Sequence, residues 1–304
     1  MKLIKFIEEK FWLTFLVAVI LGFLVPVFGK ALNFLIIPIL MVILFLTYLK
    51  TDFMEIISHI KKPVFLIYIL FMFLLVIPAA VFGIFQFINP ELSIGFLLLC
   101  SMPAAVSSPV LTNIVKGNTS LTIVVSLFSH LVAPFTVTLL FFLFTQKILP
   151  LDLVSLSKTL LLLALVPLLS AQIIRKTSSK IINATKSYYS LISIFLVSAL
   201  AYIGISTQAN EIIRNPVSAF LNILWVYALF IFLHILGYLV AFWRNKEDKV
   251  ALSVAKTYMN ISLALGLALA FFPPKIALIV VLGNISWNTT LGPFNYFLKK
   301  FNFD

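Results

Sequence analysis

Residues 101–113 read SMPAAVSSPVLTN and decide the fold. They lie inside the apolar stretch 92–115, where Pro103 and Pro109 flank small and hydroxylic residues. Proline removes a backbone hydrogen bond from a helix, so two prolines this close predict a helix that is interrupted within the stretch. The alternative is a continuous helix with a structural kink, because membrane helices tolerate proline.

The composition places this break inside a membrane. The chain has 304 residues, of which 62% are hydrophobic and 11% charged, and its mean hydropathy is +1.15. These values exclude a soluble globular protein. A net charge of +12 suggests nucleic acid in a soluble chain, but here the basic residues fall almost wholly in predicted loops, so we expect a lipid bilayer as partner and no nucleic acid. The single Cys100 excludes a disulfide framework within the chain.

About ten apolar stretches are long enough to cross a bilayer of roughly 30 Å. We therefore predict an all-α polytopic membrane protein. The predicted spans are 12–28, 32–49, 64–87, 92–115, 119–145, 151–173, 188–206, 216–243, 250–272 and 276–298.

The basic residues predict the orientation of these spans, because cytoplasmic loops carry an excess of lysine and arginine. With a cytoplasmic N-terminus, the inner side holds Lys2, Lys5, Lys10, Lys50, Lys61, Lys62, Lys116, Arg175, Lys176, Lys180, Lys186, Arg244, Lys246, Lys249, Lys299 and Lys300. The outer side holds only Lys30, Lys147, Lys158, Arg214 and Lys275. We expect a multi-pass protein of the cytoplasmic (inner) membrane with both termini in the cytoplasm.

Two halves of five spans each, 1–149 and 150–304, predict an inverted repeat, since an odd number of spans inverts the second copy. The sequence SLTIVVSLFSHLVAPF at 120–135 resembles IALIVVLGNISWNTTLGPF at 276–294 once a short gap is allowed. Chance similarity between two apolar helices is the alternative. The repeat pairs the fourth span with the ninth, so we expect a break in both.

The ninth span carries the least expected residue of the chain, Lys256, within a polar island. The island consists of Lys256, Thr257, Tyr258, Met259, Asn260 and Ser262. A charged side chain at membrane depth costs about 2.5–3.5 kcal/mol on insertion scales and usually marks a substrate, ion or proton path. All ten acidic residues lie in predicted loops, tails or span ends, so no carboxylate is expected near the bilayer midplane.

Three motifs resemble the bile acid:sodium symporter family: PAAVSSPVLTNIVKGNTSLTIVVSLFSHLVAP at 103–134, VIP at 76–78 and KTYMN at 256–260. The resemblance covers most of the chain in span order. It implies a core domain of spans 3–5 and 8–10 and a panel domain of spans 1, 2, 6 and 7. The broken fourth and ninth helices would cross in the core, and an organic anion would bind in the cleft between the two domains.

The resemblance also implies two sodium sites behind the crossing, which this chain keeps only in part. Ser108, Thr122 and Ser126 retain hydroxyls at positions that match the family's ligands. Four positions depart: Pro109 replaces an asparagine, Phe73 a glutamine, Lys256 the shared glutamate and Asn260 a glutamine. We predict that the ammonium of Lys256 replaces a sodium ion and donates hydrogen bonds to Ser108, Thr122, Ser126 or freed backbone carbonyls.

Two mechanisms follow from this substitution. If Lys256 keeps its proton, we expect sodium-independent facilitated diffusion or exchange of a small organic anion by alternating access. If Lys256 loses and regains a proton, the protein is a proton-coupled carrier or exporter of organic anions. A channel is a further alternative.

The remaining candidates are polar residues that would line the substrate cleft. They are Thr112, Asn113, Tyr258, Asn288 and His130. Asn288 is placed there by the resemblance, and helix-to-helix hydrogen bonding is the alternative for the others. His130 and His234 each have a packing role as the alternative. The sequence holds no HExxH or GxSxG motif and no paired aspartates, so we expect no enzyme, cofactor or bound metal, while the substrate and the oligomeric state stay open.

Overall fold

The computed structural model describes residues 11–49, 63–146, 149 and 151–300, and helices make up 87% of it. The all-helical class is therefore confirmed. In the first half of the chain the helices are α2 (Phe11–Leu24), α3 (Pro26–Ala31), η1 (Asn33–Leu35), α4 (Ile36–Leu49), α6 (Pro63–Phe71), the π-helical turn η2 (Met72–Val76), α7 (Ile77–Phe85), α8 (Pro90–Ser101), α9 (Ser108–Ile114) and α10 (Thr119–Thr145). In the second half they are α11 (Leu153–Thr177), α12 (Ser179–Arg214), α13 (Pro216–Leu239), α14 (Lys246–Thr257), α15 (Ile261–Phe271), α16 (Pro274–Thr289) and α17 (Leu291–Lys300).

Helix length and composition support part of the predicted set of spans. Among the described residues, the helices long and apolar enough to cross a membrane are Pro63–Phe85, Thr119–Thr145, Leu153–Thr177, Ala184–Arg214 and Pro216–Leu239. A sixth span results if α16 and α17, which are bent by 42°, are counted as one. The other predicted spans hold shorter apolar helices, Leu13–Leu24, Asn33–Leu49, Pro90–Ser101 and Ile261–Phe271. Several residues used to predict the orientation lie outside the described part of the chain, namely Lys2, Lys5, Lys10, Lys50, Lys61, Lys62 and Lys147.

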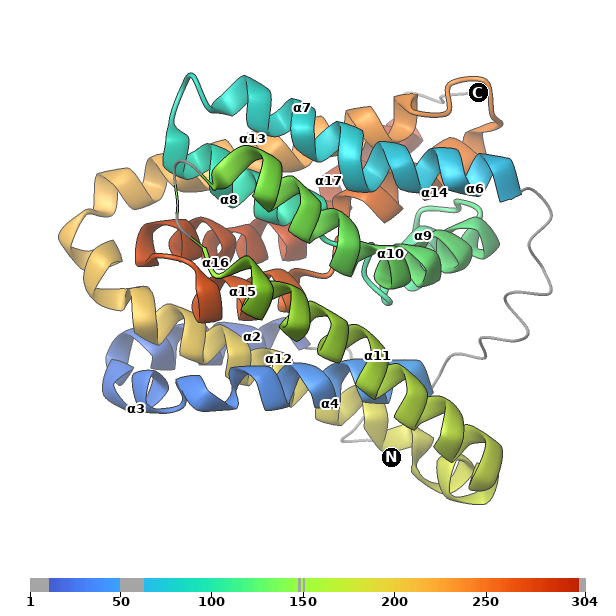
Figure 1. Ribbon diagram of the computed structural model, residues 1–304, viewed down its shortest axis with the longest axis horizontal. Coiled ribbons are helices and arrows are strands. Elements are labelled where there is room, and N and C mark those ends of the chain that lie inside the picture. Colours follow the sequence, from blue (N-terminus) through green and yellow to red (C-terminus); the bar gives the residue numbers. More distant parts are fainter. Residues whose placement is uncertain (1–10, 50–62, 147–148, 150, 301–304) are drawn as a thin grey trace.

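The helices form two groups that pack against each other at several helix pairs (Figure 1). Along one side, α12 packs on α2, α3 and α4, and α11 packs on α4. On the other side, α7 packs on α8, α13 on α14 and α16, and α10 on α9 and α14. The groups touch where α10 meets α11, where α15 meets α4, and where α12 meets α15 and α16. Helices far apart in sequence therefore surround α8, α9, α14 and α15.

Both predicted breaks are confirmed, and they lie against each other. The first separates α8 from α9 between Ser101 and Ser108, and the second separates α14 from α15 between Thr257 and Ile261. Ala104 pairs with Met259 in an antiparallel bridge. The Ala105 amide donates to the Tyr258 carbonyl over 2.8 Å, and the Asn260 amide donates to the Pro103 carbonyl over 2.7 Å. These bonds satisfy backbone groups that the broken helices leave without helical partners.

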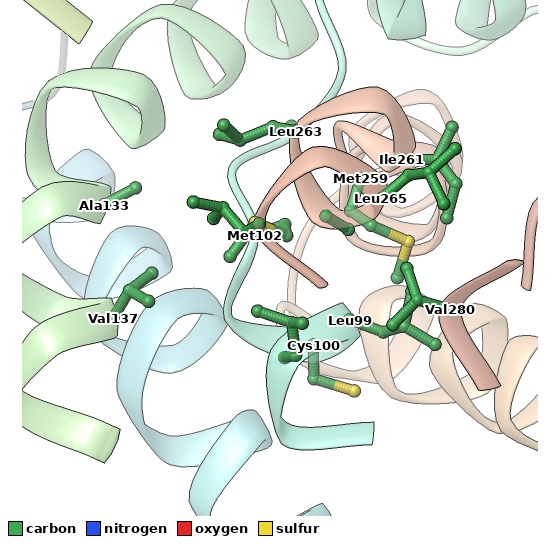
Figure 2. Close-up of a cluster of buried hydrophobic side chains, with 14 of the residues drawn as sticks. Leu99, Cys100, Met102, Ala133, Val137, Met259, Ile261, Leu263, Leu265 and Val280 are labelled. Carbon is green, nitrogen blue, oxygen red and sulfur yellow. The ribbon is translucent and has the colours of Figure 1, made fainter. Parts of the chain in front are cut away.

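Apolar side chains enclose the place where the two breaks cross (Figure 2). Leu99 and Met102 come from the first broken segment, and Met259, Ile261 and Leu263 come from the second. All five are buried. The exchanged backbone hydrogen bonds therefore lie in a medium of low dielectric, where leaving a polar group unpaired costs several kcal/mol, on the order of 2–7. We call this arrangement of residues 102–107 and 258–260 the crossing.

Candidate functional site

Lys256 lies in the last turn of α14, directly before the crossing, and is only 3% exposed. Its Nζ atom donates to the Phe73 carbonyl over 2.6 Å and to the Cys100 carbonyl over 2.7 Å. Nζ also lies 5.6 Å from the centre of the Phe73 ring, within the range of a cation–π contact. The cation is thus bound by two backbone oxygens from α8 and η2.

The Phe73 carbonyl is available because the helix around it is irregular. In an α-helix it would accept from the Ile77 amide, but that amide donates to Met72 instead, which closes the π-turn η2. The next position in line is Pro78, which has no N–H. The π-turn and the proline together free one carbonyl, and Lys256 takes it.

The Cys100 carbonyl is freed in a similar way at the end of α8. The residue three positions on is Pro103, which has no N–H to donate. The Ala104 amide, four positions on, donates to Ser129 Oγ over 3.1 Å. Because the C-terminal end of a helix carries partial negative charge, the ammonium on Cys100 is also favoured by the dipole of α8.

No carboxylate approaches the Lys256 ammonium in the hydrogen bonds and ion pairs of the described residues. The described acidic residues are Glu91, Asp152, Glu211, Glu247 and Asp248. Only Asp248 is buried, and it pairs with Arg244 and accepts from Asn118 Nδ2 over 2.7 Å. The hydrogen-bond partners of the Lys256 amino group are therefore carbonyl dipoles.

The hydroxyls predicted to receive Lys256 bind the crossing itself. Ser108 Oγ donates to the Ala105 carbonyl over 2.5 Å, and Ser126 Oγ donates to the carbonyls of Ala104 and Ala105 at 3.0 and 3.1 Å. Of the predicted partners, Lys256 thus uses freed backbone carbonyls, and the serine hydroxyls stabilise the chain between α8 and α9.

Thr112 and Thr122 pair with each other one turn further along α9. Their hydroxyl oxygens are 3.0 Å apart, and Thr112 also donates to the Ser108 carbonyl over 2.9 Å. Pro109 is half-buried in the first turn of α9, while Asn113 is exposed near its end. The structure therefore brings Ser108, Thr112, Thr122 and Ser126 together and leaves Asn113 apart.

Asn260 and His130 form the second polar contact of the crossing. Asn260 Oδ1 accepts from the Leu263 amide over 3.1 Å and so caps α15. Its Nδ2 atom lies 3.1 Å from His130 Nε2, and His130 Nδ1 lies 2.8 Å from the Ser126 carbonyl. His130 therefore links α10 to the start of α15.

Tyr258 and Asn288 lie on the side of α16. The buried Tyr258 hydroxyl is 3.1 Å from Thr290 Oγ1, and Asn288 Nδ2 donates to the Asn284 carbonyl over 2.7 Å. Trp287 Nε1 donates to the Met259 carbonyl over 2.9 Å and so helps to hold the crossing. The contacts of Tyr258 and Trp287 therefore join α16 to the crossing, whereas Asn288 bonds within α16.

His130 also faces a recess between the two groups of helices. The recess is narrow, with a volume of about 10 Å³, which is room for roughly one water molecule, and its walls come from α4, α10, α11 and α15. It is lined by Leu44, Tyr48, His130, Ala133, Pro134, Leu160, Leu163, Ala164 and Leu263. Of the predicted cleft residues, only His130 lines this recess. Tyr48 was not foreseen, since nothing in the second span distinguishes one tyrosine among apolar residues.

The sequence of this chain is similar to a family of transporters and to two bacterial proteins. The model of the SBF-like CPA transporter family matches residues 9–283. One similar protein is the uncharacterized sodium-dependent transporter YocS of Bacillus subtilis, 26% identical over 312 residues, 98% of this chain and 94% of that protein. Another is the uncharacterized protein YbaS of the same organism, 24% identical over 294 residues, 93% of this chain and 95% of that protein.

Proposed function

Because the chain belongs to the SBF-like CPA transporter family, a family of membrane transporters resembling the bile acid:sodium symporters, we propose that it carries a small organic anion without sodium. In this proposal the ammonium of Lys256 takes the place of a sodium ion. Transport proceeds by alternating access.

The observation that carries the proposal is the pair of carbonyl contacts to Lys256 Nζ at 2.6 and 2.7 Å. Sodium, like other hard cations, prefers oxygen ligands. Here two oxygens already bind a cation that is part of the chain. A second unit charge about 4 Å away would be repelled by about 4 kcal/mol at an effective dielectric constant of 20. This repulsion opposes the binding of sodium next to a charged Lys256.

The name of YocS describes that protein as sodium-dependent. The present proposal departs from that property because of Lys256 and its two carbonyl partners. It makes the effect of sodium the decisive measurement.

The arrangement of helices supports alternating access between two units. The panel domain consists of α2, α3, α4, α11 and α12, and the core domain of α6–α10 and α13–α17. The breaks at 102–107 and 258–260 fall in the two halves 1–149 and 150–304, as expected of an inverted repeat. The recess lies between α4 and α11 of the panel and α10 and α15 of the core, where rocking of one unit would open it to either side.

The walls of the recess support a small, mostly aliphatic substrate. Tyr48 and His130 offer the polar groups, and leucine, alanine and proline supply the rest. With a volume of about 10 Å³ the recess is nearly closed in this conformation, so a compact organic acid would enter, with its apolar part against the leucines, when the two units move apart.

The test is uptake of short organic acids into proteoliposomes under separately imposed sodium and proton gradients. Acids that raise the melting temperature of the purified protein are tested first. We expect saturable uptake that an inward sodium gradient leaves unchanged. Clear stimulation by sodium at constant membrane potential contradicts the proposal, and an ion current that does not saturate indicates a channel.

A further inference from the structure

The hydrogen bonds of His130 determine which of its ring nitrogens carries a proton. Nδ1 faces the Ser126 carbonyl, which can only accept, so Nδ1 is protonated. Nε2 faces the amide nitrogen of Asn260, which can only donate, so Nε2 carries a lone pair. In this conformation His130 is therefore the neutral tautomer with hydrogen on Nδ1.

Asn260 cannot turn freely to suit another protonation state. Its Oδ1 atom accepts from the Leu263 amide at the start of α15, which fixes Nδ2 toward His130. Its backbone amide donates to the Pro103 carbonyl within the crossing. A change at His130 Nε2 thus acts on the cap of α15 and on the crossing through one residue.

We propose that His130 is a proton-binding site whose occupation releases Asn260. A proton on Nε2 would face the Asn260 amide group, donor against donor. Asn260 must then either move away or turn its Oδ1 toward Nε2 and leave the Leu263 amide without its cap. Either outcome loosens the crossing at the end of α15 that borders the recess. This inference rests on the proposed transport function and adds the proton as a second ligand.

The surroundings of His130 indicate what would accompany the proton. From α4, Tyr48 meets the imidazole edge-on, with ring centres 6.1 Å apart. Near the crossing, the other titratable groups are Cys100 of α8, Lys256 of α14 and Tyr258, whose hydroxyl faces Thr290, and the recess residues of α11 and α15 are apolar. Among the described residues lining the recess, none has an acidic side chain. A substrate carboxylate that enters when the recess opens would supply the missing negative charge, so the proton and the anion bind together.

Lys256 is less suited to couple a proton to movement. Both of its hydrogen-bond acceptors are carbonyl oxygens, and an ammonium or an uncharged amine can donate to either. Losing a proton from Lys256 therefore requires neither partner to turn. Gaining one on His130 forces Asn260 to do so.

The direct test follows the imidazole by nitrogen-15 NMR in lipid nanodiscs. The protein carries His59→Gln and His234→Asn, so His130 gives the only side-chain histidine signals. We expect the tautomer with hydrogen on Nδ1 at pH 8 and protonation as the pH falls to 4.5, at higher pH when a bound short-chain carboxylate such as isobutyrate is present. Hydrogen exchange at the first turn of α15, measured relative to its intrinsic rate at each pH, should quicken at least tenfold in parallel.

A matched variant, Asn260→Asp, sharpens the test. The aspartate keeps an oxygen for the Leu263 amide and can accept from a protonated Nε2. We expect the midpoint of His130 protonation to rise by at least one pH unit. Asn113→Asp in the same background is the control, because it makes the same change of charge on the exposed side of α9, and the His130 midpoint should not move.

Two results overturn the proposal. One is an imidazole that stays neutral down to pH 4.5 with the carboxylate present and in the Asn260→Asp protein. The other is protonation with unchanged hydrogen exchange at the start of α15. Neither measurement involves sodium or transport, so failure of the proposed function, seen as sodium-driven uptake, is recorded separately.

Discussion

Lys256 Nζ lies 2.6 Å from the carbonyl oxygen of Phe73, in a helix that reaches the crossing from a distant part of the sequence. The contact joins α14 to the π-turn η2 with one strong, charge-assisted hydrogen bond. The Cys100 contact adds α8, so one side chain holds three segments together.

Replacing Lys256 with methionine should destabilise the protein by about 2–4 kcal/mol, since two buried carbonyls lose their donor. Methionine has a similar length and fills most of the space. The measurement is thermal unfolding in detergent, with Lys275→Met as the control because Lys275 is exposed and pairs only with Glu91. An unaffected melting temperature in Lys256→Met would show that the ammonium does not hold the crossing.

Lys256→Glu should create a sodium response. A carboxylate beside the Phe73 and Cys100 carbonyls offers an oxygen-rich, negative site, which suits a hard cation. We expect sodium, but not potassium or choline, to raise the melting temperature of Lys256→Glu while leaving the wild-type protein unchanged. A sodium-specific rise in the wild-type protein would contradict the proposed substitution.

Pro78 and Lys256 should be energetically coupled through the Phe73 carbonyl, to which Lys256 donates and Pro78 cannot. In Pro78→Ala the new amide can donate to the freed carbonyls of this turn and compete with Lys256. We expect the destabilisation caused by Lys256→Met to be at least about 1 kcal/mol smaller in the Pro78→Ala background, which a double-mutant cycle measures. Additive effects would mean that the proline does not control the Phe73 carbonyl.

Asp248 braces the start of α14. Its carboxylate accepts from Asn118 Nδ2 and Arg244 Nε, each over 2.7 Å, and it is 1% exposed. Asp248→Ala leaves both donors without their acceptor and should cost about 3 kcal/mol in the free energy of unfolding. The neighbouring exposed Glu247 provides the control: Glu247→Ala should change this free energy by less than about 0.5 kcal/mol.

Gly117 allows the turn before α10 to approach α14 closely. A Cβ atom at this position would lie 2.7 Å from Thr112 Cγ2 and 3.0 Å from the backbone nitrogen of Ala251. Gly117→Ala should therefore destabilise by about 1–3 kcal/mol. Gly83→Ala is the matched control, because no atom lies within 4 Å of the added methyl group and alanine favours the helix by up to about 1 kcal/mol.

The sequence predicted the crossing better than it predicted the contacts within it. Pro103 and Pro109 predicted the first break because they lack backbone donors. The second break was predicted only from the pairing of the two halves of the chain. The burial of Lys256 followed from its apolar neighbours. Ten spans were predicted, but helix length supports five or six among the described residues, since several stretches are broken or short.

The partners of Lys256 were harder to predict, because they depend on tertiary structure. The π-turn at Met72–Val76 has no local signature apart from Pro78, so the Phe73 carbonyl could not be singled out. Ser108 and Ser126 were expected to accept hydrogen bonds from Lys256. Their hydroxyls instead donate to the carbonyls of residues 104 and 105. Asn113 was expected in the cleft and is exposed, because α9 turns that face outward.

Because the carbonyls of Phe73 and Cys100 bind a side chain, the stability of the folded state does not depend on the concentration of a free ion at this place. A dissociable ion stabilises the folded state by an amount that grows with the logarithm of its concentration. A side chain is present at the same effective concentration in every environment. If Lys256 replaces sodium as proposed, the stability of the folded state should not depend on the sodium concentration, and dialysis or a competing ion should not change it.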